Sequence, residues 1–427
     1  MKNKNIFLFF NKIFFIFCYV KIPFYLEEYN FNNNFNFIEY LENKIIFINL
    51  SIGDYLKTYK IYIDLLDNFL ILSNNSYQNF NNNLTNEKNI IFQNNIYEKA
   101  FCVKDNISIK NENDSIIEFE SNFLLGTKIN DNFYINNEKY NNTLGLKYMN
   151  NNIELYNYNF LYNLKEKNII SKLIFYFNFT NNKIDLNQGN LIIGEYPHKI
   201  NLLLKKEDLY KMNILFKISF IECASKFHSI YINNNLIEEN KEIYFNVNFN
   251  GFKAPKNFFS FINNSFFNEY YKNENCFYVH NNKSFIYCNS NVNIKKFPEI
   301  KFYNKEINYT FVLTFKDLFI EINNKYYFLI VCESYNWIFG IPFIKKYNPV
   351  FDQENKYIGF YKKYLTENLL NNNINKKINY QLIINIILLL LLIFLLIYIC
   401  NYLKKNRKIR ANELEDNYNY FLDKNIK

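Results

Sequence analysis

The chain has 427 residues, enough for two domains of ordinary size or one large bilobal domain. It contains only 8 glycines but 47 phenylalanines and 38 tyrosines, and 49% of its residues are hydrophobic. This composition excludes collagen-like, linker-like and disulfide-dense proteins, and it provides ample apolar material for a core. The net charge of +9 would indicate nucleic-acid binding only if it were clustered, and the visible cluster, Lys404–Arg410, directly follows an apolar segment. We therefore expect no nucleic-acid partner.

That C-terminal apolar segment has the length of a membrane span. Nineteen residues from Leu382 to Cys400 are almost wholly apolar, and as a helix they would rise about 28 Å, close to the ~30 Å hydrocarbon core of a bilayer. Since basic flanks stay cytoplasmic, we expect a transmembrane helix over 381–402 and a cytoplasmic tail over 403–427. The Asn-rich residues 366–380 are expected to form a stalk.

The N-terminus has a basic start followed by an apolar stretch that Asn11 and Lys12 interrupt. This pattern over residues 1–23 indicates a signal peptide, with an uncleaved signal anchor as the alternative. With the C-terminal span, it predicts a single-pass type I membrane protein. Its ectodomain would lie in the secretory lumen or at the cell surface.

The cysteines fit an oxidising compartment without defining a metal site. Outside the apolar ends the sequence contains Cys102, Cys223, Cys276, Cys288 and Cys332, and this odd number leaves at least one thiol over. No spacing is typical of zinc ligands, the three histidines are isolated, and no glycine-rich phosphate loop is present. We therefore expect neither a metal nor a cofactor. The sequence leaves the oligomeric state open.

The region between the ends has the pattern of a mostly β protein. Short β-branched and aromatic runs, such as YKIYIDLL, KLIFYFNFT and EIYFNVNF, are separated by Asn, Asp and Lys clusters. Helical patterns are few, and the better ones lie near 160–170 and 255–267.

Residues Asn336–Phe360 resemble the C-terminal block of the pepsin-like aspartic proteases. In that family a W-I-L-G strand and turn is followed by F-x-x-x-Y-x-x-V-F-D-x-x-N-x-x-I-G-F. The positions that match are Trp337, Gly340, Phe343, Tyr347, Val350, Phe351, Asp352, Asn355, Ile358 and Gly359. The resemblance implies two β-barrel-like lobes with a central cleft, an N-terminal lobe over 36–205 and a C-terminal lobe over 206–365.

Other family features follow in chain order. Ser51-Ile-Gly53 is similar to the turn of the first hairpin, Thr143-Leu-Gly-Leu146 to the family's I-L-G-L, and Gly189–Gly194 to the strand that closes lobe one. Seven of the eight glycines fall at or beside family turn positions, where positive φ or close approach is needed. Gly251 has no clear family counterpart.

The catalytic motifs of this family have decayed in the sequence. Two aspartates, each in a D-T/S-G turn, share one proton and act as general base and acid. Asp64 occupies the first position, but Leu65 and Leu66 replace its Thr-Gly pair. Counting back nine residues from Pro255 places Asn246 at the second position, followed by Val247-Asn248.

The flap of this family, a hairpin that covers the cleft, resembles Ile117–Asp131, with Phe119 at the place of its tyrosine. The resemblance implies that Phe119 packs on a bound peptide, and that Leu65, Leu66 and Val247 line the site. It also implies a disulfide between Cys288 and Cys332 in lobe two, with Cys276–Cys288 as the competing pairing.

Because Asn246 cannot form a shared-proton dyad with Asp64, we expect an inactive, membrane-anchored member of the fold that binds a peptide or protein segment as a pseudoprotease. One alternative is an active aspartic-type endopeptidase with atypical loops, which carries out proteolysis in a secretory compartment. Another is a structural or adhesive ectodomain that acts through its loops.

Overall fold

The computed structural model describes residues 19–27, 35–53, 57–65, 67–73, 77, 90–91, 97–111, 115–129, 142–147, 158–180, 188–215, 224–280, 283–334 and 336–366. The expected stalk, transmembrane helix and cytoplasmic tail lie outside these residues, apart from Thr366. All described residues but this last one belong to a single compact unit, Met1–Leu365.

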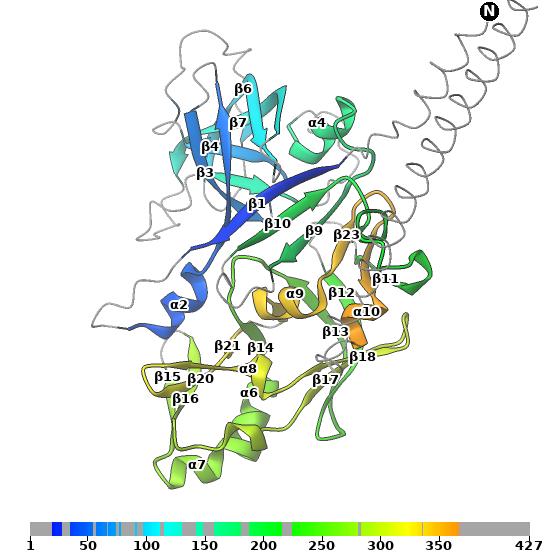
Figure 1. Ribbon diagram of the computed structural model, residues 1–427. Helices are drawn as coiled ribbons and strands as arrows, with labels where there is room; N and C mark the ends of the chain where they lie inside the picture. Colours follow the sequence, from blue (N-terminus) through cyan, green and yellow to red (C-terminus); the bar gives the residue numbers. More distant parts are fainter. Residues whose placement is uncertain are drawn as a thin grey trace, which may run out of the picture. The chain divides into compact units, whose positions relative to one another are not determined.

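The first sheet joins thirteen of the described strands and includes strands from both halves of the sequence (Figure 1). Its order is β11 (Leu209–Asn213), β24 (Tyr357–Tyr361), β23 (Val350–Asp352), β9 (Ile174–Phe179), β10 (Gln188–Ile193), β1 (Val20–Leu26), β2 (Ile46–Ile52), β3 (Lys57–Asp64), β8 (Thr143–Gly145), β4 (Leu70–Ser73), β7 (Ile116–Ile129), β6 (Tyr97–Lys110) and β5 (Ile90–Ile91). The C-terminal strands β23 and β24 thus return to the N-terminal half of the fold.

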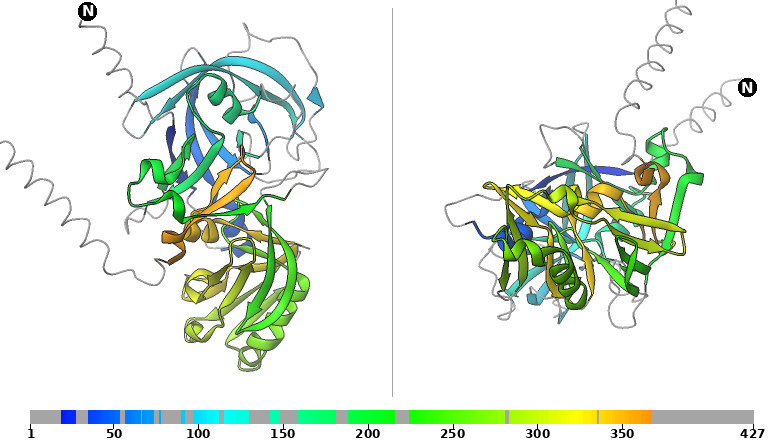
Figure 2. Two further views of the ribbon diagram at one scale, coloured as in Figure 1. Left: turned by 90° about the vertical axis from the view of Figure 1, so that its right-hand side faces the viewer. Right: turned by 90° about the horizontal axis from the view of Figure 1, so that it is seen from below.

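The second sheet joins eleven of the described strands, all from the C-terminal half. Its order is β18 (Tyr309–Leu313), β17 (Ile300–Asn304), β12 (Ala224–Ile232), β13 (Asn235–Phe245), β22 (Trp337–Phe339), β14 (Phe252–Pro255), β21 (Ile330–Ser334), β16 (Ser284–Asn289), β20 (Lys325–Phe328) and β19 (Phe319–Ile322), with β15 (Cys276–His280) paired to β16. Figure 2 shows the blue and cyan strands of the N-terminal half and the green and yellow strands of the C-terminal half as two groups. The expected mostly β, bilobal architecture therefore fits the structure.

Short helices connect and cover the strands. They are α2 (Phe37–Asn43), α4 (Phe160–Glu166), α5 (Pro197–Ile200), α6 (Lys256–Ile262), a π-helical segment η3 (Asn263–Phe267), α7 (Asn268–Lys272), α8 (Phe315–Leu318), α9 (Ile341–Tyr347) and α10 (Lys362–Thr366), with 3-10 turns η2 (Lys206–Asp208) and η4 (Ile294–Lys296). The helices expected near 160–170 and 255–267 are confirmed by α4 and by α6 with η3.

The sequence block Asn336–Phe360 forms a strand, a helix and a hairpin. Gly340 is the N-cap of α9, Pro342 lies in its first turn, and Asn348 ends the helix in the left-handed region at φ 50°. Both features are usual at helix ends, since proline lacks the N–H that a first turn leaves unpaired and asparagine tolerates positive φ. Trp337 is fully buried in the core that this block completes.

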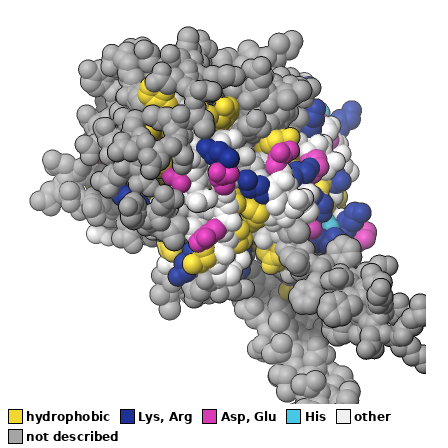
Figure 3. All heavy atoms as spheres, turned by 90° about the horizontal axis from the view of Figure 1, so that it is seen from above, with side chains coloured by type: hydrophobic (Ala, Val, Ile, Leu, Met, Phe, Trp, Pro, Cys, Tyr) yellow, Lys and Arg dark blue, Asp and Glu magenta, His cyan; other side chains and the backbone are white. Residues whose placement is uncertain are grey.

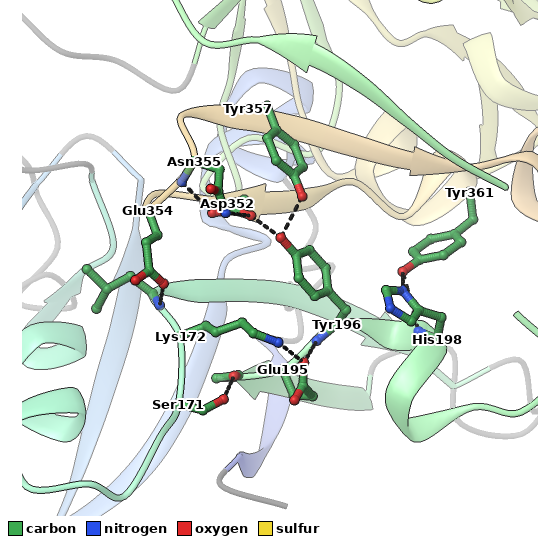
Figure 4. A network of polar contacts seen from close by, with 12 residues as sticks. Ser171, Lys172, Glu195, Tyr196, His198, Asp352, Glu354, Asn355, Tyr357 and Tyr361 are labelled. Carbon is green, nitrogen blue, oxygen red and sulfur yellow. Dashed lines mark hydrogen bonds and ion pairs between the residues drawn. The ribbon is translucent and has the colours of Figure 1, made fainter. Parts of the chain in front are cut away.

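A polar network fixes the β23–β24 hairpin to the strands beside it (Figure 4). The buried carboxylate of Asp352 accepts hydrogen bonds from the Tyr196 hydroxyl and from the backbone N–H and side-chain amide of Asn355, the last two at 2.8 and 2.9 Å. The Tyr196 and Tyr357 hydroxyls lie 2.5 Å apart. The aspartate and asparagine of the family block therefore have a structural role here.

The N-terminal lobe starts earlier than expected. Val20–Leu26 forms β1, which alternates buried and half-buried residues and pairs with β10 and β2 in the middle of the first sheet. The lobe therefore begins by Val20 and not at residue 36. The expected signal segment 1–23 overlaps this strand, because the period-two pattern of VKIPFYL is hidden at the end of a long apolar stretch.

The expected fold class needs one correction. It combined the bilobal β fold with one C-terminal transmembrane helix over 381–402. Among the residues that the structure describes, no helix is long and apolar enough to cross a membrane. The transmembrane helix is therefore removed from the fold class, which is mostly β with two barrel-like sheets.

The expected disulfide Cys288–Cys332 is also wrong. Cys288 is bonded to Cys276, and Cys332 is a free, half-buried thiol. The reason is strand register: Cys276 and Cys288 face each other directly across the β15–β16 pair, whereas Cys332 faces Ser284.

We expect disulfide mapping to find this pairing. Mass spectrometry of a non-reduced digest should detect a peptide pair that joins Cys276 to Cys288. Because the bond closes a loop of sequence separation 12, Cys276→Ser should lower the free energy of unfolding by about 2–3 kcal/mol. Cys332→Ser is the control and should cost less, and a Cys288–Cys332 peptide pair would contradict the structure.

Candidate functional site

The two halves of the chain repeat one strand arrangement around the expected catalytic positions. In the N-terminal half, β3 runs parallel to β8, and the following strand β4 runs antiparallel to β8. In the C-terminal half, β13 runs parallel to β22, and β14 runs antiparallel to β22. In both halves a short loop leaves the end of the first strand and enters the third. We name them the first loop (65–69) and the second loop (246–251).

Asp64 is the last residue of β3 and lies opposite Gly145 of β8. Its carbonyl oxygen accepts a hydrogen bond from the Leu146 N–H at 2.7 Å, and the Gly145 N–H donates to the Phe69 carbonyl at 2.8 Å. A Cβ atom on Gly145 would lie 2.5 Å from the backbone of Asp67, so the glycine lets the first loop lie against β8. The half-buried Asp64 side chain is thus carried on a tightly held backbone.

Asn246 stands at the corresponding position of the second half. It directly follows Phe245 of β13, which pairs with Phe339 of β22. Asn246 is therefore adjacent to Gly340, just as Asp64 is adjacent to Gly145 in the first half. Its N–H donates to the Phe339 carbonyl at 2.9 Å, and its side-chain Oδ1 accepts from the Asn248 N–H at 2.7 Å. In the D-T-G turn that this loop resembles, the glycine N–H donates to the aspartate in the same way. Here the acceptor is an amide oxygen.

The residues that replace the two threonines belong to the core. Leu65 and Val247 are fully buried and pack in the main hydrophobic cluster. The expectation that they line a binding surface is therefore not met in this structure, because neither exposes any side-chain area. Leu66 lies outside the described residues.

Phe119 lies on β7, four residues beyond the turn residue Ser115, opposite Ile107 of β6. It is 7% exposed, and its ring lies 6.1 Å from that of Phe160 on α4. Contact between Phe119 and a bound peptide remains a prediction.

The sequence reading missed Asp67, a second carboxyl on the first loop. Burial raises the pKa of the Asp67 carboxyl to about 7, and the negative charge of Asp64 acts in the same direction. The N–H groups of Asn68 and Phe69 and the charge of Lys147 oppose this rise in pKa. The sequence does show a second aspartate three residues after Asp64. Whether the two carboxyl groups lie close together depends on the path of the first loop, which the sequence does not give.

Each loop also carries a buried amide oxygen that no described group satisfies. These atoms are the Oδ1 of Asn68 and the Oδ1 of Asn248. An unpaired buried acceptor is costly, so such atoms are places where a donor from solvent or from a bound segment fits. No group of three or more histidine, cysteine or acidic residues in the described part of the chain could hold a metal ion.

Comparison with known proteins bears on the fold. No protein-family model matches the chain, and no curated protein sequence is similar to it. Among the solved structures that match is basic 7S globulin from soybean, with a TM-score of 0.60 and 11% sequence identity over 82% of this chain and 97% of the globulin. That globulin has the fold of the pepsin-like aspartic proteases. The likeness therefore shows that this chain shares the mostly β, bilobal fold of that globulin, and it supports the resemblance to the pepsin-like fold.

Proposed function

We propose that this chain is a pseudoprotease: a protein of pepsin-like fold that binds an extended peptide or protein segment and does not cleave it. The observation that carries the proposal is the amide of Asn246. It directly follows β13, one residue after Phe245, which pairs with Phe339, and so corresponds to Asp64 at the end of β3; its Oδ1 accepts the Asn248 N–H.

The chemistry of an amide explains the loss of activity. Hydrolysis in this fold needs one carboxylate to take a proton from water and one carboxylic acid to polarise the peptide carbonyl. An asparagine side chain neither gains nor loses a proton at physiological pH. It still accepts and donates hydrogen bonds, so the second loop keeps the ability to bind a peptide backbone.

The disulfide Cys276–Cys288 supports a location in the secretory lumen or at the cell surface, as part of the same proposal. Structural disulfides form and persist in oxidising compartments and are rare in the cytosol.

A diverse peptide pool, incubated with the full chain between about pH 3.5 and 7, where aspartic dyads act, tests the proposal. We expect peptides to be retained and none to be cleaved. Asp64→Ala should weaken retention about tenfold or more, because a hydrogen bond to a charged group contributes about 1.5–3 kcal/mol. Mass spectrometry of the bound and free peptides measures both results.

The control is Glu207→Ala, which changes an exposed carboxylate on η2 and should leave retention unchanged. Cleavage that Asp64→Ala abolishes would overturn the pseudoprotease. Retention that Asp64→Ala leaves unchanged would place the bound peptide elsewhere on the molecule.

A second candidate function is hydrolysis by the two carboxyls of the first loop. Asp67 favours it, because a carboxyl with a pKa of about 7 beside Asp64 is still partly protonated near neutral pH. Asp64 would then act on water as the base, and Asp67 would donate a proton. Cleavage lost in both Asp64→Asn and Asp67→Asn, but kept in Asn246→Ala, would favour this candidate over the pseudoprotease.

A further inference from the structure

The segment between α5 and η2 exposes two neighbouring leucines. Leu202 is 93% exposed and Leu203 is 53% exposed, whereas the next residue, Leu204, is buried. The loop backbone is held in place, since the Leu203 N–H donates to the Asn201 side chain at 3.0 Å and the Asn201 N–H donates to the Pro197 carbonyl at 2.7 Å. A fixed loop that presents large apolar side chains to solvent marks an interaction site.

Lysines surround these leucines. The segment 197–212 contains Lys199, Lys205, Lys206 and Lys211, against two acidic residues, Glu207 and Asp208. The first three lysines form no ion pair with an acidic group of the described chain. In Figure 3, basic side chains lie near a histidine at one edge of the visible surface, together with acidic side chains.

α10 begins next to this segment, because Tyr361, the last residue of β24, pairs with Leu209 of β11. Lys362 and Lys363 directly follow Tyr361, whose hydroxyl lies 2.5 Å from the Nδ1 of His198 on α5 (Figure 4). We call the exposed surface of residues 199–206 the Leu202 face; its residues are Lys199, Leu202, Leu203, Lys205 and Lys206.

Both ends of the described chain reach the packing beneath the Leu202 face. Leu204 and Tyr361 belong to one small hydrophobic cluster, and Tyr19 and Tyr364 pack against it. Residues 1–18 and 367–427 continue from these points, and their sequences include the apolar stretches at 6–10 and 382–400.

We propose that the Leu202 face docks on an anionic lipid surface, with Leu202 and Leu203 inserted at the boundary between headgroups and acyl chains. The lysines attract the negative headgroups of acidic lipids, and the leucines bury apolar area at the headgroup–acyl boundary; these two contributions set the strength of interfacial membrane binding. A protein partner would have to be acidic and apolar at the same place, and nothing at the Leu202 face favours it over lipid. This inference does not depend on peptide binding at Asp64.

Tryptophan quenching tests this contact locally. The chain has one tryptophan, Trp337, which is fully buried. Full-length Leu202→Trp is mixed with vesicles of phosphatidylcholine and phosphatidylserine whose acyl chains carry bromine, which quenches nearby indoles. We expect the added tryptophan to lose about half or more of its fluorescence, as a side chain inserted 5–10 Å into the boundary would.

The control is Leu236→Trp, at a residue 48% exposed near the β12–β13 turn of the second sheet. It should not be quenched, even when the chain is bound to the vesicles through other segments.

Replacing Lys199, Lys205 and Lys206 with glutamine should weaken docking about 100-fold, because each lysine near an anionic surface contributes about fivefold. Absence of quenching at residue 202 on vesicle-bound protein, or equal quenching at both positions, would overturn the proposal. The proposal would also be overturned if the tryptophan at residue 202 were quenched as strongly by vesicles of pure phosphatidylcholine as by vesicles that contain phosphatidylserine.

Discussion

Replacing Gly340 with alanine should destabilise the fold by about 3 kcal/mol or more, a large part of the roughly 5–15 kcal/mol that stabilises a typical domain. A Cβ atom on Gly340 would lie 2.0 Å from the Phe249 carbonyl oxygen and 2.5 Å from that of Gly251. Neither oxygen can move freely, because the first accepts the Ile341 N–H at 2.8 Å and the second accepts the Gly340 N–H at 3.0 Å. The second loop would have to leave β22, and Asn246 would lose its position.

Urea unfolding, followed by the fluorescence of the single tryptophan, measures this effect. Trp337 is buried three residues before Gly340, so its emission reports on the same region. The matched control is Gly359→Ala, whose Cβ would meet only side-chain atoms, the nearest being Leu209 Cδ1 at 2.7 Å, which can shift. A loss of stability in Gly340→Ala no larger than in Gly359→Ala would contradict the close packing of the second loop.

Gly145 should behave like Gly340, because it holds the same place in the other half of the fold. Its Cβ would lie 2.5 Å from the Asp67 carbonyl group and from the Phe69 nitrogen. The two glycines were predictable from the sequence, since a chain so poor in glycine keeps them where a side chain cannot fit. Gly251 has no counterpart in the family pattern, and the structure shows why a glycine is needed there. A Cβ atom on Gly251 would lie 2.6 Å from the Leu329 carbonyl oxygen.

The sequence predicted the fold best where many specific residues occur in a fixed order. The block around Trp337 and Gly340 forms the strand and turn that its resemblance implies, and these lead into helix α9 and the β23–β24 hairpin. β1 was missed because a strand buried in the middle of a sheet and an apolar signal segment have similar composition. The pairing of Cys276 was left open because it depends on the register of β15 and β16, which short alternating runs do not specify.

The candidate site was predicted less completely than the fold. Counting from Pro255 placed Asn246 at the end of β13, the register equivalent of Asp64. The burial of Phe119, Leu65 and Val247 depends on long-range packing, which one sequence does not give. Asp67 depends on the path of the first loop, and its unusual ionisation has a direct consequence for stability.

Removing the Asp67 carboxyl should stabilise the protein near neutral pH and flatten its dependence on pH. The pKa of Asp67 is about 7 in the folded chain, raised by burial and by Asp64, against an ordinary value of 3.8. The folded state therefore holds this proton more tightly than the unfolded state does. The stability from protonated Asp67 is fully present below about pH 4, is lost as the pH rises to about 7, and then stays constant.

The size of this loss follows from the two pKa values. A rise from 3.8 to about 7 corresponds to about 4 kcal/mol, and partial exposure of the carboxyl reduces the expected loss to about 2 kcal/mol. Asp67→Asn keeps an oxygen that can accept the Asn68 N–H, a bond of 2.7 Å in the wild type, but has no proton to lose. At pH 7.5 the variant should therefore exceed the wild type in free energy of unfolding by about 2 kcal/mol, whereas at pH 4 the difference should disappear.

Urea unfolding of both proteins at the two pH values, again followed by Trp337 fluorescence, measures the difference. Other carboxyls also titrate in this range, but they are common to both proteins and cancel in the comparison. Glu207→Gln, which neutralises an exposed carboxylate on η2, should leave the wild-type pH dependence in place. If Asp67→Asn kept that dependence too, Asp67 would be ionised throughout the range, and the acid pair of the first loop would have no chemical basis. If the part of the pH dependence assigned to Asp67 disappears only in Asp67→Asn, the wild-type Asp67 carboxyl keeps a proton near neutral pH beside Asp64. Hydrolysis by this pair of carboxyls requires that property.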